Sequence, residues 1–207
     1  MCNDEVQTSK WIKLACKRYL SWFDREDVFF NEALIDKIFH FISLLKHFEG
    51  EFSNQKVKLL DFQKFLICQI YGFFYEADPT KRVTEEALIV MARKNAKSAI
   101  CCILALADMV CGTSAEKGSA LPYYEGYIIS NTRDQSKIDL KFIQGYAKSL
   151  DAQCKKQHFK HYQNYTKYLK SNGFIKALSA ESGVSDGLRP SLVICDELHA
   201  TPNESMI

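Results

Sequence analysis

The feature that most constrains the fold is the segment from residue 87 to residue 110. It consists of an apolar run, ALIVM at 87–91, then a short basic loop ending in Lys97-Ser98, then a long apolar stretch. The short run predicts a buried strand, and the stretch from Lys97 to Val110 predicts a helix. Strand, loop and helix in this order direct several backbone N–H groups and the positive helix end at one place. The segment therefore predicts an anion-binding site within an α/β fold.

The same alternation continues downstream. Apolar runs at 124–130, 174–180 and 191–197 predict further strands, and the pattern from Asp134 to Leu150 predicts a helix between them. Strands that alternate with helices favour a mainly parallel sheet flanked by helices. Upstream, the apolar spacing predicts a helical N-terminal segment, with helices across Trp11–Phe48 and Val57–Phe74 and a boundary near residue 80.

Composition limits the class of protein. The 207 residues are 47% hydrophobic, which is enough for a sizeable core, and the net charge of +2 gives no global electrostatic argument for binding nucleic acid. The eight cysteines form no C-x-x-C pair and mostly lie in apolar stretches, which is typical of reduced thiols in a cytosol. Neither a membrane-spanning run nor a secretory signal is evident, so we expect a soluble, cytoplasmic protein without a membrane partner.

The basic loop has the residue types of a phosphate-binding loop. Lys97 is suited to bind the β- and γ-phosphates of a nucleotide, and the Ser98 hydroxyl is suited to bind a magnesium ion. The usual pattern, G-x-x-x-x-G-K-[ST], is broken at two positions, because Met91 and Ala96 stand where it has glycine. A basic loop that merely caps a buried helix is the alternative.

A second motif supports the first. In SLVICDE at 191–197, an apolar run predicts a strand that delivers Asp196 and Glu197 at its C-terminal edge, where open parallel sheets place their ligands. Asp196 is our candidate metal ligand, and Glu197 the residue that polarises the attacking water. A solvated acidic turn is the alternative for this pair alone. Together the two motifs predict an ATPase that uses ATP and Mg²⁺.

Two further features are less specific. Gln63 opens an apolar helix and has an amide suited to the adenine edge, although an exposed helical glutamine is the commoner explanation of such a residue. The run at 155–170 mixes lysines with aromatic residues and is a candidate for contact with DNA phosphates. For that run, an exposed amphipathic helix or loop is the alternative.

Four segments in order, and at suitable spacings, resemble the large subunits of bacteriophage terminases, in particular the ATPase domain. They are DFQKFLI, VMARKNAKS, YIISNTRDQSK and SAESGVSDGLRPSLVICDELHA. The resemblance implies a P-loop NTPase-like fold and an ATP-hydrolysing motor that drives double-stranded DNA into the capsid. It implies that Arg93 acts on the γ-phosphate, that Gln63 contacts adenine, and that the phosphate loop comprises Arg93, Lys94, Asn95, Ala96, Lys97 and Ser98.

The resemblance also implies partners and a domain division. The partners are double-stranded DNA, the portal protein and a small terminase subunit, with a homo-oligomeric ring in the full-length protein. The place of action is the host cell cytoplasm, transiently at the procapsid portal. Residues 1–80 would form the helical segment with the adenine-side glutamine, and 81–207 an ATPase core that is incomplete at its C-terminus. We expect no nuclease in this segment.

Two alternatives remain open. Asp196-Glu197-Leu198-His199 also fits the D-E-x-H box of helicase-like ATPases. A catalytically inactive terminase fragment is the other, because a methyl group at Ala96 occupies a place where the backbone must approach the phosphates closely.

Overall fold

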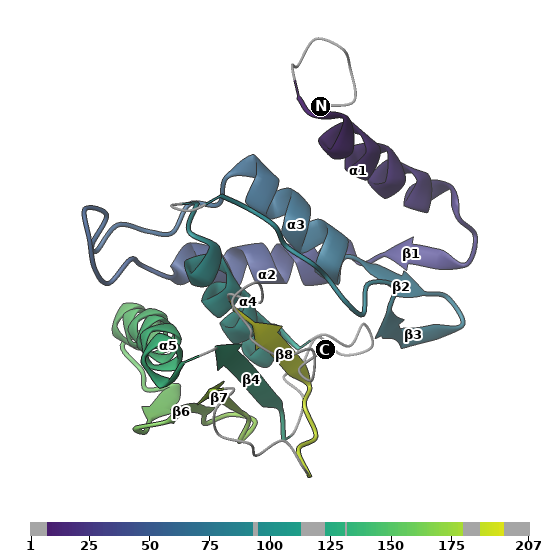
Figure 1. Cartoon of the computed structure of the whole chain (residues 1–207). Helices are drawn as coiled ribbons and strands as arrows, with labels where there is room; N and C mark the ends of the chain where they lie inside the picture. The colour runs from purple at the N-terminus through teal and green to yellow at the C-terminus, as the bar shows by residue number, and fades with distance from the viewer. Residues whose placement is uncertain (1–7, 93–94, 113–122, 131, 180–186, 197–207) are drawn as a thin grey trace.

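The computed structural model describes residues 8–92, 95–112, 123–130, 132–179 and 187–196. Its elements are α1 (Lys10–Ser21), a 3-10 helix (Trp22–Asp24), β1 (Val28–Phe30), α2 (Glu32–Leu44), α3 (Asp61–Tyr71), β2 (Phe73–Tyr75), β3 (Asp78–Arg82), α4 (Lys97–Cys111), β4 (Glu125–Ser130), α5 (Arg133–Cys154), β5 (Phe159–His161), β6 (Tyr165–Tyr168), β7 (Phe174–Ser179) and β8 (Leu192–Cys195). Figure 1 shows α1 at the end of the molecule remote from β6 and β7. Among the described helices, none combines the length and apolar character needed to cross a membrane.

The N-terminal segment is helical, as predicted, but a strand interrupts it. The Asn31 side chain accepts a hydrogen bond from the Leu34 N–H at 2.9 Å and so starts α2 as a new helix. Immediately before it, the aromatic run of β1 pairs antiparallel with β2, with Phe30 opposite Phe73. The helical spacing did not predict β1, which forms because β-branched and aromatic residues favour a pleated strand once a partner strand is present.

The second predicted helix, Val57–Phe74, is shorter than expected. Only α3 is helical, and Phe73 and Phe74 belong to β2. The Phe73 ring packs edge-on against Trp22 and Phe30, at centroid distances of 5.0 and 5.1 Å. These aromatic contacts hold the small three-stranded sheet β1-β2-β3 against the end of α1.

The larger sheet has five strands in the order β5-β6-β7-β4-β8. β4 pairs in parallel with β7 on one side and with β8 on the other, which confirms an α/β sheet with helices packed against it. β5 and β6 extend the β7 side in antiparallel orientation. The sheet is therefore mixed, because β5 and β6 are joined by a short turn, and a short turn can connect only antiparallel strands.

The run 87–91, predicted to be a strand, has no regular secondary structure. The side chains of Leu88 and Val90 are 79% and 86% exposed. Within the described ranges no strand of either sheet pairs with this run. The prediction was wrong because an apolar run forms a strand only when another strand satisfies its backbone hydrogen bonds.

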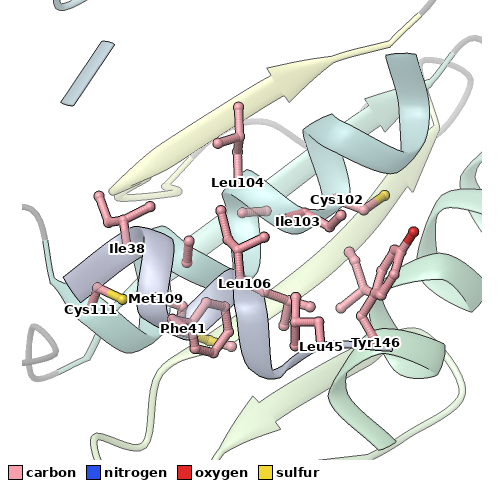
Figure 2. Close-up of a cluster of buried hydrophobic side chains, with 14 of the residues drawn as sticks. Ile38, Phe41, Leu45, Cys102, Ile103, Leu104, Leu106, Met109, Cys111 and Tyr146 are labelled. Carbon is pink, nitrogen blue, oxygen red and sulfur yellow. The ribbon is translucent and has the colours of Figure 1, made fainter. Parts of the chain in front are cut away.

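The core is centred on α4 and joins both parts of the chain. Leu106 and Met109 of α4 are fully buried, and Ile38 and Phe41 of α2 lie against this helix, as Figure 2 shows. Tyr146 of α5 belongs to the same cluster (Figure 2). Burying each such side chain stabilises the fold by roughly 1.5–3 kcal/mol. The helical segment and the sheet thus share one core, and the boundary expected near residue 80 falls within β3.

Candidate nucleotide site

The first half of the site is the beginning of α4. Lys97 is the first residue of this helix, and Ala96 precedes it as the N-cap with φ 56° and ψ 32°, in the left-handed region. Within the loop before α4, the Asn95 side-chain amide donates a hydrogen bond to the Ala92 carbonyl at 3.1 Å. The first N–H groups of an α-helix lack partners within the helix and carry a partial positive charge. This end of α4 is therefore suited to an anion.

The second half is the residue that follows β8. Asp196 is held beside the end of β4, because its backbone N–H donates to the Ile129 carbonyl at 2.9 Å. Its side chain is 3% exposed. The parallel pairing of β4 and β8 places this carboxylate at the C-terminal edge of the sheet, which is where open parallel sheets bind ligands.

The fold brings the two halves together across 98 residues of sequence. The Ser98 hydroxyl donates to Asp196 Oδ2 at 2.7 Å, and the Lys97 ammonium lies 3.3 Å from Asp196 Oδ1. Lys97 thus balances a carboxylate that burial would otherwise destabilise. The three side chains predicted to form the centre of the site are in direct contact.

The oxygen atoms at this point suit a magnesium ion. Magnesium prefers hard oxygen ligands in an octahedron at about 2.0–2.1 Å, so neighbouring ligands lie about 2.9 Å apart. Ser98 Oγ and Asp196 Oδ2 are oxygen atoms of this kind, and their hydrogen bond of 2.7 Å holds them side by side. A serine hydroxyl and one carboxylate leave several positions for water and phosphate oxygens, which is how magnesium is commonly bound with nucleotides.

A second buried carboxylate lies behind the site, and the sequence analysis missed it. Asp139 of α5 is 1% exposed, and the hydroxyl of Ser130, the last residue of β4, donates to Asp139 Oδ2 at 2.5 Å. Within the described residues, Asp139 Oδ1 has no hydrogen-bond partner. Burial raises the pKa of Asp139 to about 6; the Ser130 hydrogen bond lowers this pKa, and the nearby charge of Asp196 raises it.

One sequence signal could have identified Asp139. The buried side chains of α5 recur at helical spacing, at Ser136, Leu140, Ile143 and Tyr146. Asp139 falls within this stripe, where an acidic residue is unexpected. An acid in an apolar stripe indicates a specific partner, which here is Ser130.

The thiols near the site are packed rather than reactive. Burial raises the pKa of Cys101 to about 11 and that of Cys102 well above its ordinary value. A thiol is nucleophilic only as the thiolate, so neither side chain is activated.

The remaining predicted site residues are only partly described. Arg93, Lys94 and Glu197 lie outside the described residues. Gln63 lies in the first turn of α3, where its side-chain oxygen accepts a hydrogen bond from the Leu60 N–H at 2.9 Å. In this structure the glutamine therefore caps its own helix, a role that the sequence analysis did not assign to it.

Most of the chain is similar to known proteins. Residues 61–207 match the model of the family described as terminase large subunit, ATPase domain. The fold is similar to the crystal structure of the HK97 bacteriophage large terminase, with a TM-score of 0.60 and 23% sequence identity over 78% of this chain. The similarity covers 30% of that chain. A comparison with curated proteins gave no match.

The family match covers most of the chain, including the acidic motif. The chain is therefore a terminase ATPase domain and not a helicase-like ATPase. The match begins at the first residue of α3 and includes both halves of the site. This chain belongs to the family of terminase large-subunit ATPase domains.

Proposed function

We propose that this chain binds Mg·ATP at Lys97, Ser98 and Asp196 and is the ATPase module of a DNA-packaging terminase. The observation that carries the proposal is the contact of all three side chains at the start of α4 and the end of β8. A lysine, a hydroxyl and a carboxylate at one helix N-terminus match the phosphates and the metal of a nucleotide.

Each of the three side chains has a distinct proposed role. Lys97 exchanges its contact with Asp196 for the β- and γ-phosphates when the nucleotide enters. Ser98 and Asp196 hold Mg²⁺, which when bound neutralises charge on the phosphate oxygens. In the nucleotide-free protein, the ion pair between Lys97 and Asp196 keeps both groups close to the positions in which they are needed.

The other assignments rest on the order of residues in the motifs. Glu197, next to Asp196, is the proposed general base that polarises the attacking water. Arg93 is the proposed partner of the γ-phosphate, because a guanidinium matches charge that develops on phosphate oxygens. The loop of Lys94, Asn95 and Ala96 supplies backbone N–H groups, and Gln63 is the proposed adenine contact.

Family membership supports a proposal for the larger assembly. We propose that ATP hydrolysis here drives double-stranded DNA into a capsid, in a homo-oligomeric ring at the portal protein, with a small terminase subunit that selects the DNA. Family membership through residues 61–207 supports this, and the chain corresponds to 30% of the HK97 bacteriophage large terminase. We assign no nuclease activity to these residues.

A second candidate function is a module that binds nucleotide without turning it over. The observation that favours it is the left-handed backbone of Ala96, with φ 56°, where an alanine side chain is strained next to Lys97. In that case the chain binds Mg·ATP but hydrolyses it no faster than the Lys97→Ala variant does.

The proposal is tested by titration of a fluorescent ATP analogue, with and without magnesium. We expect saturable binding to the wild type that magnesium tightens, and loss of the magnesium effect in Asp196→Asn. Asp134→Asn is the matched control, because its carboxylate is 91% exposed on α5. The proposal fails if folded wild type does not bind the analogue, or if Asp196→Asn keeps the full magnesium effect.

A further inference from the structure

The hairpin of β5 and β6 carries a concentration of positive charge outside the nucleotide site. Residues 155–170 contain five lysines and no Asp or Glu. The alternative of an exposed amphipathic helix is wrong for this segment, because β5 and β6 form paired strands within it, and the residues around them are turns and loop. The turn between them is held to α5, since the Gln144 side chain donates to the Tyr162 carbonyl at 2.9 Å. The charge is therefore presented on a fixed scaffold.

The strands have two different faces. Phe159, Thr166, Tyr168 and Ile175 are buried on the side of the core. Alternation places lysines and tyrosines on the opposite side, and the register sets Lys160 opposite Lys167 and Tyr165 opposite Lys176. We call this surface the lysine face, and it comprises Lys160, Tyr162, Tyr165, Lys167 and Lys176.

The charge on the lysine face is not compensated within the described part of the chain. No ion pair there involves Lys160, Lys167 or Lys176, although other surface lysines have acidic partners, such as Lys137 with Asp134 at 3.0 Å. Like charges directly opposite each other on neighbouring strands destabilise a sheet. The arrangement of Lys160 and Lys167 thus has an energetic cost that a bound polyanion removes.

The tyrosines of the lysine face favour a phosphate backbone over unstacked bases. Tyr162 and Tyr165 stack on each other with centroids 4.3 Å apart and planes 12° apart. The Lys160 ammonium lies 5.3 Å from the centre of the Tyr162 ring. Binding of single strands uses open aromatic faces on which bases stack. Here the rings cover one another and orient a lysine, so the ammonium groups are the contact points.

The turn of the hairpin lies at the same edge of the sheet as the nucleotide site. The Asn164 carbonyl accepts a hydrogen bond from the N–H of Ala177, near the C-terminal end of β7, at 3.3 Å. β7 is parallel to β4, and β4 is parallel to β8, which precedes Asp196. A ligand on the lysine face can thus reach the edge at which ATP is proposed to bind.

We propose that the lysine face binds the phosphate backbone of double-stranded DNA without regard to sequence. This inference rests on the proposed function, because DNA is the polyanion on which a packaging ATPase acts. Each lysine that neutralises a phosphate releases condensed counterions, so the affinity falls steeply with salt. In that case the lysine face is the surface with which the motor domain contacts DNA.

The test is fluorescence anisotropy of a labelled short duplex, measured against salt concentration. The variant is Lys160→Gln with Lys167→Gln, which keeps most of each side-chain stem and removes two charges. The matched control is Lys10→Gln with Lys17→Gln, on α1 at the remote end of the molecule (Figure 1). We expect the hairpin variant to lose roughly tenfold or more in affinity at 0.1 M salt, and its salt slope to fall by about two. The control should bind like the wild type.

Three results would overturn the inference: no binding of duplex by the wild type, equal losses in both variants, or a preference for single strands over the duplex. Binding of the fluorescent ATP analogue is measured in the same samples, and the hairpin variant should bind it as the wild type does. Wild type that binds ATP but not DNA contradicts only the lysine face. Wild type that binds DNA through the lysine face but does not bind ATP contradicts only the nucleotide site.

Discussion

Ala96 has a backbone conformation that an alanine side chain disfavours. Its φ of 56° and ψ of 32° lie in the left-handed region, at the residue that caps α4 and precedes Lys97. The usual phosphate loop has glycine at this position, and glycine adopts such angles without strain. The strain is therefore located next to the lysine that we assign to the phosphates.

Ala96→Gly is expected to stabilise the protein. Relief of left-handed strain is worth about 1–2 kcal/mol, and the extra flexibility of unfolded glycine offsets roughly 0.5–1 kcal/mol of this. We predict that the free energy of unfolding rises by about 0.5–1 kcal/mol, as measured by urea denaturation. Ala99→Gly, inside α4, is the matched control and should cost about 1 kcal/mol. Equal destabilisation by both changes would contradict the strain at Ala96.

Asp139 makes stability depend on pH. Burial raises the pKa of its carboxyl from the ordinary 3.8 to about 6. The folded protein therefore binds the proton more tightly than the unfolded chain, and this contribution to stability is lost as the pH rises from about 4 to about 6. Asp108, whose pKa burial also raises to about 6, acts in the same direction.

Asp139→Asn isolates this effect, because asparagine resembles the protonated acid and its side-chain oxygen can still accept from Ser130. We predict that the variant gains about 1–2 kcal/mol of stability relative to the wild type between pH 4 and pH 7. Urea denaturation at the two pH values measures the gain, and Asp108 cancels because both proteins have it. Asp134→Asn, which removes an exposed acid from the same helix, should show no such gain. A difference that is constant with pH would rule out titration of Asp139.

At the scale of elements, the sequence identified the helices and strands that are long or strongly patterned. The predicted helix from Lys97 to Val110 corresponds to α4, and the predicted strands at 124–130, 174–180 and 191–197 correspond to β4, β7 and β8. The short strands β1 and β2 were missed because a run of three aromatic or β-branched residues also fits helical spacing. The β5–β6 hairpin was missed because lysines interrupt its apolar alternation.

The centre of the site was predictable, but its surroundings were not. Lys97, Ser98 and Asp196 follow from local patterns, namely a loop that opens a helix and acids that end a strand. The ion pair between Lys97 and Asp196 and the bond from Ser130 to Asp139 depend on the order of strands in the sheet. Strand order is a property of the whole chain, and no local pattern encodes it.

Variants of Gln63 distinguish two roles of this residue, namely capping of α3 and the proposed contact with adenine. Loss of the bond to the Leu60 N–H in Gln63→Ala should cost about 1 kcal/mol in the free energy of unfolding. Gln63→Glu should keep that stability, because a carboxylate can cap the helix in the same way. If Gln63 also contacts adenine, both variants should lose preference for ATP over GTP in competition binding. Unchanged stability of Gln63→Ala would contradict the capping role.

At the scale of the whole molecule, α4 belongs both to the nucleotide site and to the hydrophobic core. Its first residue, Lys97, lies in the nucleotide site, and its buried side chains contact α2, α5 and the sheet. A nucleotide at the start of α4 is therefore bound to the helix on which the core is centred. Because only the folded chain brings Lys97, Ser98 and Asp196 together, Mg·ATP should stabilise the whole protein.

The most direct measurement is thermal unfolding followed by circular dichroism, with and without Mg·ATP. At about 100 times its Kd, a ligand adds about 2.7 kcal/mol, which should raise the Tm of a protein of this size by roughly 5–10 °C. Lys97→Ala should abolish this increase, whereas Lys137→Ala, an exposed lysine on α5, should keep it. Because Lys97→Ala also removes the ion pair with Asp196, the increase is compared within each variant. An equal increase in wild type and Lys97→Ala, or no increase in folded wild type, would contradict the nucleotide site.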